Sequence, residues 1–270
     1  MAPTKKIDQT LMRRFREEFD RDEFINVLKG TTLFRDLHPR ELPIATLEEI
    51  FNLVKIVPLA KNCKLNLRQS DALYEIISGY VKIYDRALMA WEKKKKNVKN
   101  PPALLAWRIP GELLGDFRFA VPDTMLDEIE ATDECLLLMI PSELLRSLAD
   151  RYPQIYFNIA CNLAAKAIKT RVRAQILRQP NVNCMIAKMF LEFLAERGHE
   201  EEVIHDGKRL KLVKGSFKVR DIAAFLGYEY HRTQFCMHDL IKKELLYHYL
   251  SNKSGRFVCD EKGLRRYLEE

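Results

Sequence analysis

The most constraining feature of the sequence is a pair of short amphipathic segments joined at a glycine, within residues 217–243. The apolar positions of the first segment share one face of a helix, and they are Val219, Ile222, Ala223 and Leu226. Gly227 follows directly, where a sharp turn with positive φ costs little. The second segment repeats apolar positions at i, i+3, i+4 and i+7, and they are Thr233, Cys236, Met237 and Leu240. This pattern predicts a helix-turn-helix, with an ordinary helical hairpin as the alternative.

A strand–turn–strand pattern follows the second segment. Leu245–Leu250 and Arg256–Cys259 are β-prone, and Gly255 lies in the turn between them. A β-hairpin in this place is a wing, and Lys253 and Arg256 lie beside its tip, where cations can reach phosphate. The combined pattern predicts a winged helix-turn-helix, which is typical of DNA binding.

The second helix is expected to present side chains that can hydrogen-bond or stack on DNA, and they are Tyr230, His231, Arg232, Gln234, Phe235 and His238. Gln234 suits a bidentate pair with adenine, and Arg232 suits guanine or phosphate. Tyr230 and Phe235 suit thymine methyl groups, with inward packing as the alternative for Phe235. The expected contacts also include four basic residues, which are Lys218, Arg220, Lys253 and Arg256.

The net charge of the chain is concentrated at its C-terminal end. Residues 207–270 hold fourteen Lys and Arg against eight Asp and Glu, so they carry +6 of the total +7. A localised basic excess suits a polyanion such as nucleic acid, and a well-solvated basic surface is the alternative.

The middle of the chain has a different texture. From Val54 to Ile140, short β-prone segments are separated by Gly, Asn, Asp and Ser. No helical segments alternate with them, which predicts an antiparallel roll and not a parallel α/β sheet. The chain is therefore expected to be α+β, with N-terminal helices and a β-roll (residues 1–150), a long helix (151–180) and a winged helix-turn-helix domain (181–270).

The long helix is expected to begin at Pro153 and to run to about Arg178. At 1.5 Å per residue it would be about 37 Å long, which exceeds the needs of a small domain. Its apolar stripe has no obvious partner in the same chain, and it consists of Ile155, Ile159, Leu163 and Ala167. We expect this stripe to join two copies into a homodimer.

Several classes of protein are excluded by the sequence. No apolar run approaches the roughly 20 residues that cross a bilayer. The six cysteines form no Cys-x-x-Cys pair, so they are expected to be reduced core residues of a cytoplasmic protein, with no metal site. A cupin enzyme needs metal-binding histidines in its roll, yet no His lies between Val54 and Ile140. No catalytic motif rises above chance, so we expect no enzyme.

The order of these elements resembles the cyclic-AMP receptor protein/FNR (Crp/Fnr) family of bacterial transcription regulators. Four segments carry the resemblance: Leu33–Leu37, Asp71–Tyr84, Pro110–Phe117 and Val219–Gly227. The resemblance covers roughly residues 33–260. It implies a cyclic-nucleotide-binding-like β-roll, a homodimer on an inverted-repeat site in double-stranded DNA, and RNA polymerase as a partner.

The effector pocket that the resemblance implies departs from the family pattern. Its candidate residues are Gly111, Gly115, Asp116, Phe117, Met125, Leu126 and Thr170. Cyclic-nucleotide-binding members have Gly-Glu and later an Arg for the phosphate, whereas this chain has Gly115-Asp116 and no basic residue between Arg118 and Arg146. A buried phosphate without a cation is costly, so we expect no dependence on cyclic AMP and assign no cofactor. No cysteine precedes Cys63, so an N-terminal iron–sulfur cluster of the FNR type is also not expected.

Two further alternatives remain open from the sequence. One is a cyclic-nucleotide-binding-like signalling module that acts through protein contacts. The other concerns Lys93–Lys96, which is expected to be a solvated loop, with a contact to protein or DNA as its alternative.

The recognition helix also departs from the family, since Tyr230 and His231 stand where many members have Arg and Glu, so a different half-site is expected.

Overall fold

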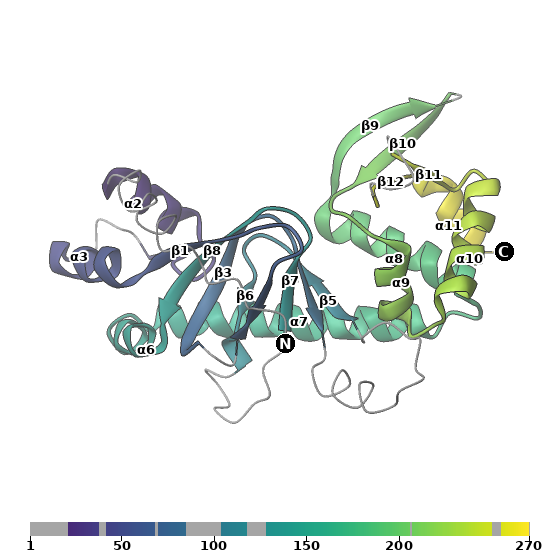
Figure 1. Cartoon of the computed structure of the whole chain (residues 1–270). Helices are drawn as coiled ribbons and strands as arrows, with labels where there is room; N and C mark the ends of the chain where they lie inside the picture. Colours follow the sequence, from purple (N-terminus) through teal and green to yellow (C-terminus); the bar gives the residue numbers. More distant parts are fainter. Residues whose placement is uncertain are drawn as a thin grey trace. The chain divides into compact units, whose positions relative to one another are not determined.

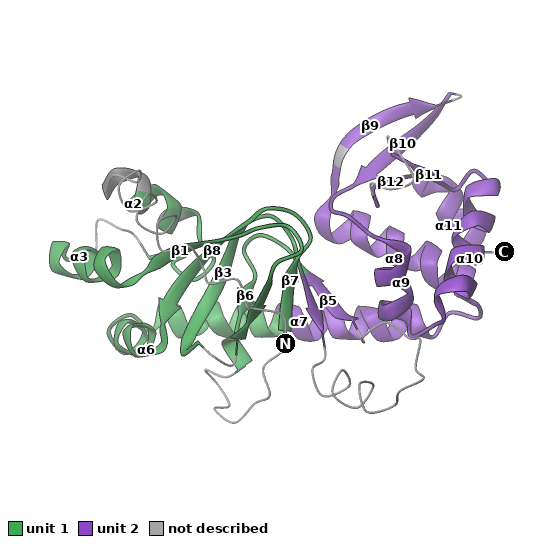
Figure 2. Cartoon of the chain, viewed as in Figure 1, with its two compact units in different colours: residues 1–81, 108–164 green, residues 82–107, 165–270 purple. Residues whose placement is uncertain are grey.

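The computed structural model of the chain describes residues 21–37, 42–67, 70–84, 104–117, 128–205, 207–249 and 255–269 (Figure 1). Two compact units make up the fold (Figure 2). Residues 1–81 and 108–164 belong to the first unit, and residues 82–107 and 165–270 belong to the second. The division into three domains that we expect from the sequence stays a prediction.

The first unit contains an antiparallel sheet with the strand order β1-β8-β3-β6. These strands are β1 (Lys55–Leu59), β8 (Cys135–Pro141), β3 (Ala72–Ser78) and β6 (Leu113–Leu114). In the centre of the sheet, Glu75 of β3 faces Leu138 of β8. A further antiparallel pair joins β2 (Lys64–Asn66) to β7 (Glu128–Ala131). The expected antiparallel roll is therefore confirmed.

Helices pack against this sheet around one hydrophobic core. They are α2 (Arg21–Gly30), α3 (Ile44–Leu53) and α6 (Ser142–Arg151). Leu33, Ile50 and Ile140 are fully buried in this core. Residues 1–20, which include the start of the expected N-terminal helices, lie outside the described residues.

The turn after β3 requires glycine for two reasons. Gly79 has φ 82°, a conformation that side chains other than glycine rarely adopt. A Cβ atom at this position would also lie 2.5 Å from Cys135 Sγ and 2.5 Å from the Glu134 carbonyl oxygen. The backbone of Glu134 and the side chain of Cys135 therefore occupy the space that a side chain at position 79 would need, at the turn between β3 and β4 (Val81–Tyr84).

The second unit contains a sheet with the order β11-β12-β10-β9. Its strands are β9 (His199–His205), β10 (Lys208–Val213), β11 (Leu246–His248) and β12 (Phe257–Cys259). Its helices, besides part of α7 (Gln154–Leu177), are α8 (Val182–Arg197), α9 (Val219–Leu226), α10 (Tyr230–Lys242) and α11 (Glu261–Glu269). The hairpin of β9 and β10 in Figure 1 was not expected from the sequence, and neither was α11.

Strands β4 (Val81–Tyr84) and β5 (Leu104–Arg108) carry side chains into the core of the second unit. The Trp107 ring lies 5.4 Å from Phe193 and 4.9 Å from Phe225, measured between ring centroids. Arg173 donates hydrogen bonds to the carbonyl oxygens of Leu105 (2.9 Å) and Phe225 (2.8 Å). Burial lowers the pKa of Arg173. Strands β4 and β5 are thus part of the packing that supports α9.

The long helix is α7, Gln154–Leu177. The expectation that its Ile155 and Ile159 lack partners in the chain is wrong, because both are buried, 0% and 4% exposed, in the core of the first unit. Leu163 packs against the same core, while Ala167 is exposed. One cysteine also differs from expectation, since Cys161 is exposed on this helix.

Candidate nucleic-acid interface

Helix α9 and the following turn have the geometry that the sequence predicts. Ile222 and Ala223 are fully buried, and Gly227 ends the helix in the left-handed conformation with φ 75°. The Gly227 amide donates to the Ala223 carbonyl oxygen over 2.9 Å. This turn allows α10 to start three residues later, at Tyr230.

The inner face of α10 is closed by packing. Thr233 and Leu240 are fully buried, and Met237 is 1% exposed. The Thr233 hydroxyl donates to the Glu229 carbonyl oxygen over 3.0 Å, so its polar group is satisfied inside the core. The buried set predicted from the sequence is confirmed, and it fixes which side of the helix faces outwards.

The outer face of α10 is a single helical row. His231, Phe235, His238 and Lys242 are spaced i, i+4, i+7 and i+11, and all four are exposed. Phe235 is 75% exposed, which rules out inward packing. Gln234 is half-buried on the flank of this row, about 100° around the helix from Phe235. The structure therefore gives Phe235, not Gln234, the central position.

Two ring contacts fix side chains at the start of α10. The Arg232 guanidinium lies 5.1 Å from the centroid of the Tyr228 ring, an arrangement that favours a cation. The Tyr230 and His231 rings meet edge to face at 5.4 Å. Arg232 and Tyr230 are both exposed, at the edges of the outer row.

The base of the wing is joined to the segment before α9. The Phe217 amide donates to the Gly255 carbonyl oxygen over 2.6 Å, next to Lys218 and the exposed Arg220. The Arg256 guanidinium lies 5.1 Å from the Tyr249 ring centroid, where the hairpin of β11 and β12 leads to its tip. Lys253 lies outside the described residues.

His248 lies on β11, a strand that contacts α10. Its ring packs on Phe257 with centroids 5.0 Å apart. Burial, with a smaller effect from His238, lowers the pKa of His248, so its neutral form is favoured. His248 was not singled out from the sequence.

Part of the basic charge is neutralised by ion pairs that lie off the outer row of α10. Lys208 pairs with Glu244 over 2.6 Å, and Lys211 pairs with Glu261 over 2.8 Å. Lys243 pairs with Asp239 over 3.2 Å. A count of charges along the sequence could not separate these paired lysines from those on the outer row.

The implied effector turn is built from residues of the first unit. Gly111 and Gly115 have φ 84° and 85°, and Asp116 is buried. Phe117 is 49% exposed. Met125 and Leu126 lie outside the described residues. In the second unit, Thr170 is exposed and its hydroxyl donates to the Lys166 carbonyl oxygen over 3.0 Å.

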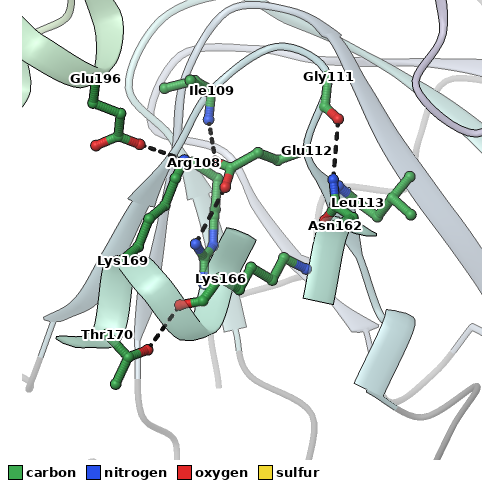
Figure 3. A network of polar contacts seen from close by, with 10 residues as sticks. All are labelled: Arg108, Ile109, Gly111, Glu112, Leu113, Asn162, Lys166, Lys169, Thr170 and Glu196. Atoms are coloured by element: carbon green, nitrogen blue, oxygen red, sulfur yellow. Dashed lines mark hydrogen bonds and ion pairs between the residues drawn. The ribbon is translucent and has the colours of Figure 1, made fainter. Parts of the chain in front are cut away.

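Three residues that the sequence did not single out hold this turn (Figure 3). Arg108 and Glu112 form a buried ion pair of 3.3 Å, and Glu112 also accepts from the Ile109 amide over 2.9 Å. Asn162 donates to the Gly111 carbonyl oxygen and accepts from the Leu113 amide, each over 3.3 Å. No signal in the linear sequence identifies this arrangement, because Asn162 is 51 residues from Gly111.

The described part of the chain holds no cluster of three or more His, Cys, Asp or Glu that could bind a metal ion. Among the described helices, none is both long and apolar enough to span a bilayer.

Comparison with known proteins adds evidence on the fold. No protein-family model and no curated protein matches the sequence. Solved structures do match. A cyclic nucleotide-binding domain containing protein from Listeria monocytogenes is 13% identical, with a TM-score of 0.61, over 88% of this chain and 98% of that chain. A transcriptional regulator of the CRP/FNR family from Thermus thermophilus is 16% identical, with a TM-score of 0.57, over 80% and 99% of the two chains.

The c-di-GMP responsive global regulator CLP of Xanthomonas campestris is 18% identical, with a TM-score of 0.58, over 80% of this chain and 98% of that chain. The chain has the fold of the Crp/Fnr transcription regulators. The resemblance stated from the sequence is thereby confirmed for the fold, with its β-roll followed by a C-terminal helix-turn-helix. At these identities the Crp/Fnr likeness extends to the fold alone.

Proposed function

We propose that this chain is a sequence-specific DNA-binding transcription regulator of the Crp/Fnr type. The supporting observation is the outer face of α10, where His231, Phe235, His238 and Lys242 are exposed above a fully packed inner face. A helix presented in this way fits the major groove, and the basic charge of residues 207–270 favours a polyanion. The protein acts without catalysis, in the cytoplasm, and with RNA polymerase as a partner.

The proposed regulator is a homodimer joined by the exposed row of α7. Phe157 and Ile168 are 61% and 63% exposed, and with Ala160, Ala164 and Arg171 they follow the spacing i, i+3, i+7, i+11 and i+14. The first four of these residues are apolar, and a row of this spacing suits a coiled-coil seam between two copies. In this proposal the exposed row, and not Ile155 and Ile159, forms the dimer contact. Two-fold symmetry then requires an inverted-repeat DNA site, with half-sites about one helical turn apart.

We also propose that DNA binding does not depend on cyclic AMP. The chain has no basic residue between Arg118 and Arg146, where the resemblance implies a phosphate-binding Arg. The nearby Arg108 is already paired with Glu112. A cyclic phosphate would have no free cation from either source.

Selection of randomised duplex DNA tests the proposed function. The wild-type protein should enrich an inverted repeat. Lys242→Ala should weaken binding to all sequences and reduce the salt dependence by about one counterion, because Lys242 lies on the outer row. Lys208→Ala removes the same charge from a lysine paired with Glu244 and should change affinity little. Failure to enrich any sequence would favour the signalling module that acts through protein contacts.

A further inference from the structure

The recognition helix has an apolar centre. Phe235 is 75% exposed in the middle of α10, between His231 one turn before it and His238 one turn after it. A large aromatic ring in water is unfavourable, whereas the opposite face of the same helix buries Met237 almost completely. The ring is therefore placed where a partner can cover it.

Charge around Phe235 favours DNA as the partner. Arg232 and Lys242 are exposed on the same side of α10. Of the acids on this helix and at its start, Asp239 is held by Asn183 and Lys243, and Glu229 is the N-cap residue, six residues before Phe235. A basic surface with an aromatic centre complements the major groove of DNA, which is a polyanion. It complements a protein surface with few acidic residues less well, and a second copy of the same basic surface would repel it.

The chemistry of the major groove indicates which group of the bases Phe235 contacts. A phenylalanine ring has no hydrogen-bonding group, and the apolar group that bases present in the major groove is the C5 methyl of thymine. Two polar side chains that could read a base lie away from the centre of the outer face of α10. Gln234 is half-buried on the flank, and the Arg232 guanidinium lies over the Tyr228 ring.

We propose that Phe235 reads thymine methyl groups, so that each half-site carries thymine where the centre of α10 meets the groove. This inference rests on the proposed function, since it assumes that α10 enters duplex DNA. Phe235 is then a specificity-determining residue whose contact is apolar, while Lys242 supplies affinity without sequence preference.

Replacement of thymine by deoxyuridine tests the inference, because it removes the methyl group and keeps the base pair and its hydrogen-bonding groups. In the selected site, each thymine is replaced in turn, and affinity is measured for wild type, Phe235→Ala and Gln234→Ala. At one or two positions per half-site, deoxyuridine should weaken wild-type binding about fourfold, as expected for one lost methyl contact. Phe235→Ala should bind thymine and deoxyuridine equally at those positions, whereas Gln234→Ala should keep the difference.

The outcomes separate the inference from the proposed function. If the wild type selects a DNA site but no thymine methyl matters, or if Phe235→Ala stays as sensitive as the wild type, the methyl contact is refuted and DNA binding stands. If the wild type selects no DNA, both are refuted, and Phe235 faces a protein. Phe235 is exposed, so its alanine variant should keep the wild-type melting temperature, which circular dichroism verifies.

Discussion

Lys82 and Asp221 form an ion pair inside the second unit, with Nζ 3.3 Å from Oδ2, although 139 residues separate them in the chain. Their side chains are 2% and 4% exposed. The pair joins β4 to the first turn of α9, so the helix-turn-helix is anchored by a residue of the β4–β5 segment. Two charges withdrawn from water stabilise each other only while both are present.

Removal of one partner should therefore cost more than removal of both. Lys82→Met should lower the free energy of unfolding by about 3–5 kcal/mol, since it leaves the buried Asp221 carboxylate with only the distant, exposed Arg220, 4.0 Å away. The double variant Lys82→Met, Asp221→Leu should recover most of that loss. Urea denaturation of the wild type, the single variants and the double variant measures both effects, and strictly additive losses would contradict a coupled pair.

Glu75 should make the stability of the first unit depend on pH. This buried carboxylate accepts hydrogen bonds from the amides of Thr32 (2.5 Å) and Leu33 (3.1 Å). Burial raises its pKa from 4.5 to about 7, against the opposing effect of these hydrogen bonds. A raised pKa means that the folded state holds the proton more tightly, so stability from this group is present below pH 4.5 and is lost as pH rises towards 7.

The expected loss from Glu75 is about 3 kcal/mol at about 1.4 kcal/mol per pH unit. Glu75→Gln cannot ionise and retains an oxygen that accepts one of the two amides. Its free energy of unfolding should therefore fall less than that of the wild type between pH 5 and pH 8. Parallel pH profiles for the two proteins would show that Glu75 does not titrate in this range.

The dimer should depend on the exposed row of α7 and not on its buried row. Phe157→Lys with Ile168→Lys should give folded monomers, because both side chains are more than 60% exposed in the single chain. Ile159→Lys should instead unfold the first unit, since it places a charge in the core. Thr170→Lys adds a charge elsewhere on the same helix and should leave a dimer. Sedimentation with circular dichroism distinguishes these results, and dimers of the double variant would refute the assignment.

Cyclic AMP should neither bind tightly nor alter DNA affinity. The reason is the missing phosphate-binding cation described above, together with the engagement of Arg108 by Glu112. Calorimetric titration measures binding, and the DNA affinity is compared with and without the nucleotide. Micromolar affinity for cyclic AMP would overturn this expectation.

Local patterns in the sequence determined the elements that carry the candidate site. The periodicity of apolar residues and the position of Gly227 predicted α9 and α10 nearly to their ends, because both signals act within one or two helical turns. The same reasoning located the short strands of the roll. It missed β9, whose sequence His199–His205 has three consecutive glutamates and little apolar alternation, so its pairing with β10 comes from the tertiary fold.

Tertiary structure alone decided which faces are covered. Periodicity places Ile155 with Ile159 and Phe157 with Ile168, but only packing against the roll buries the first pair and leaves the second exposed. The same limit applied to Phe235, whose outward position follows from the core beneath α10. The pairing of Lys82 with Asp221 had no sequence signal, because burial of an ion pair depends on chain segments brought together from a distance. Short-range patterns set the elements, whereas the non-local core sets the orientation of their side chains.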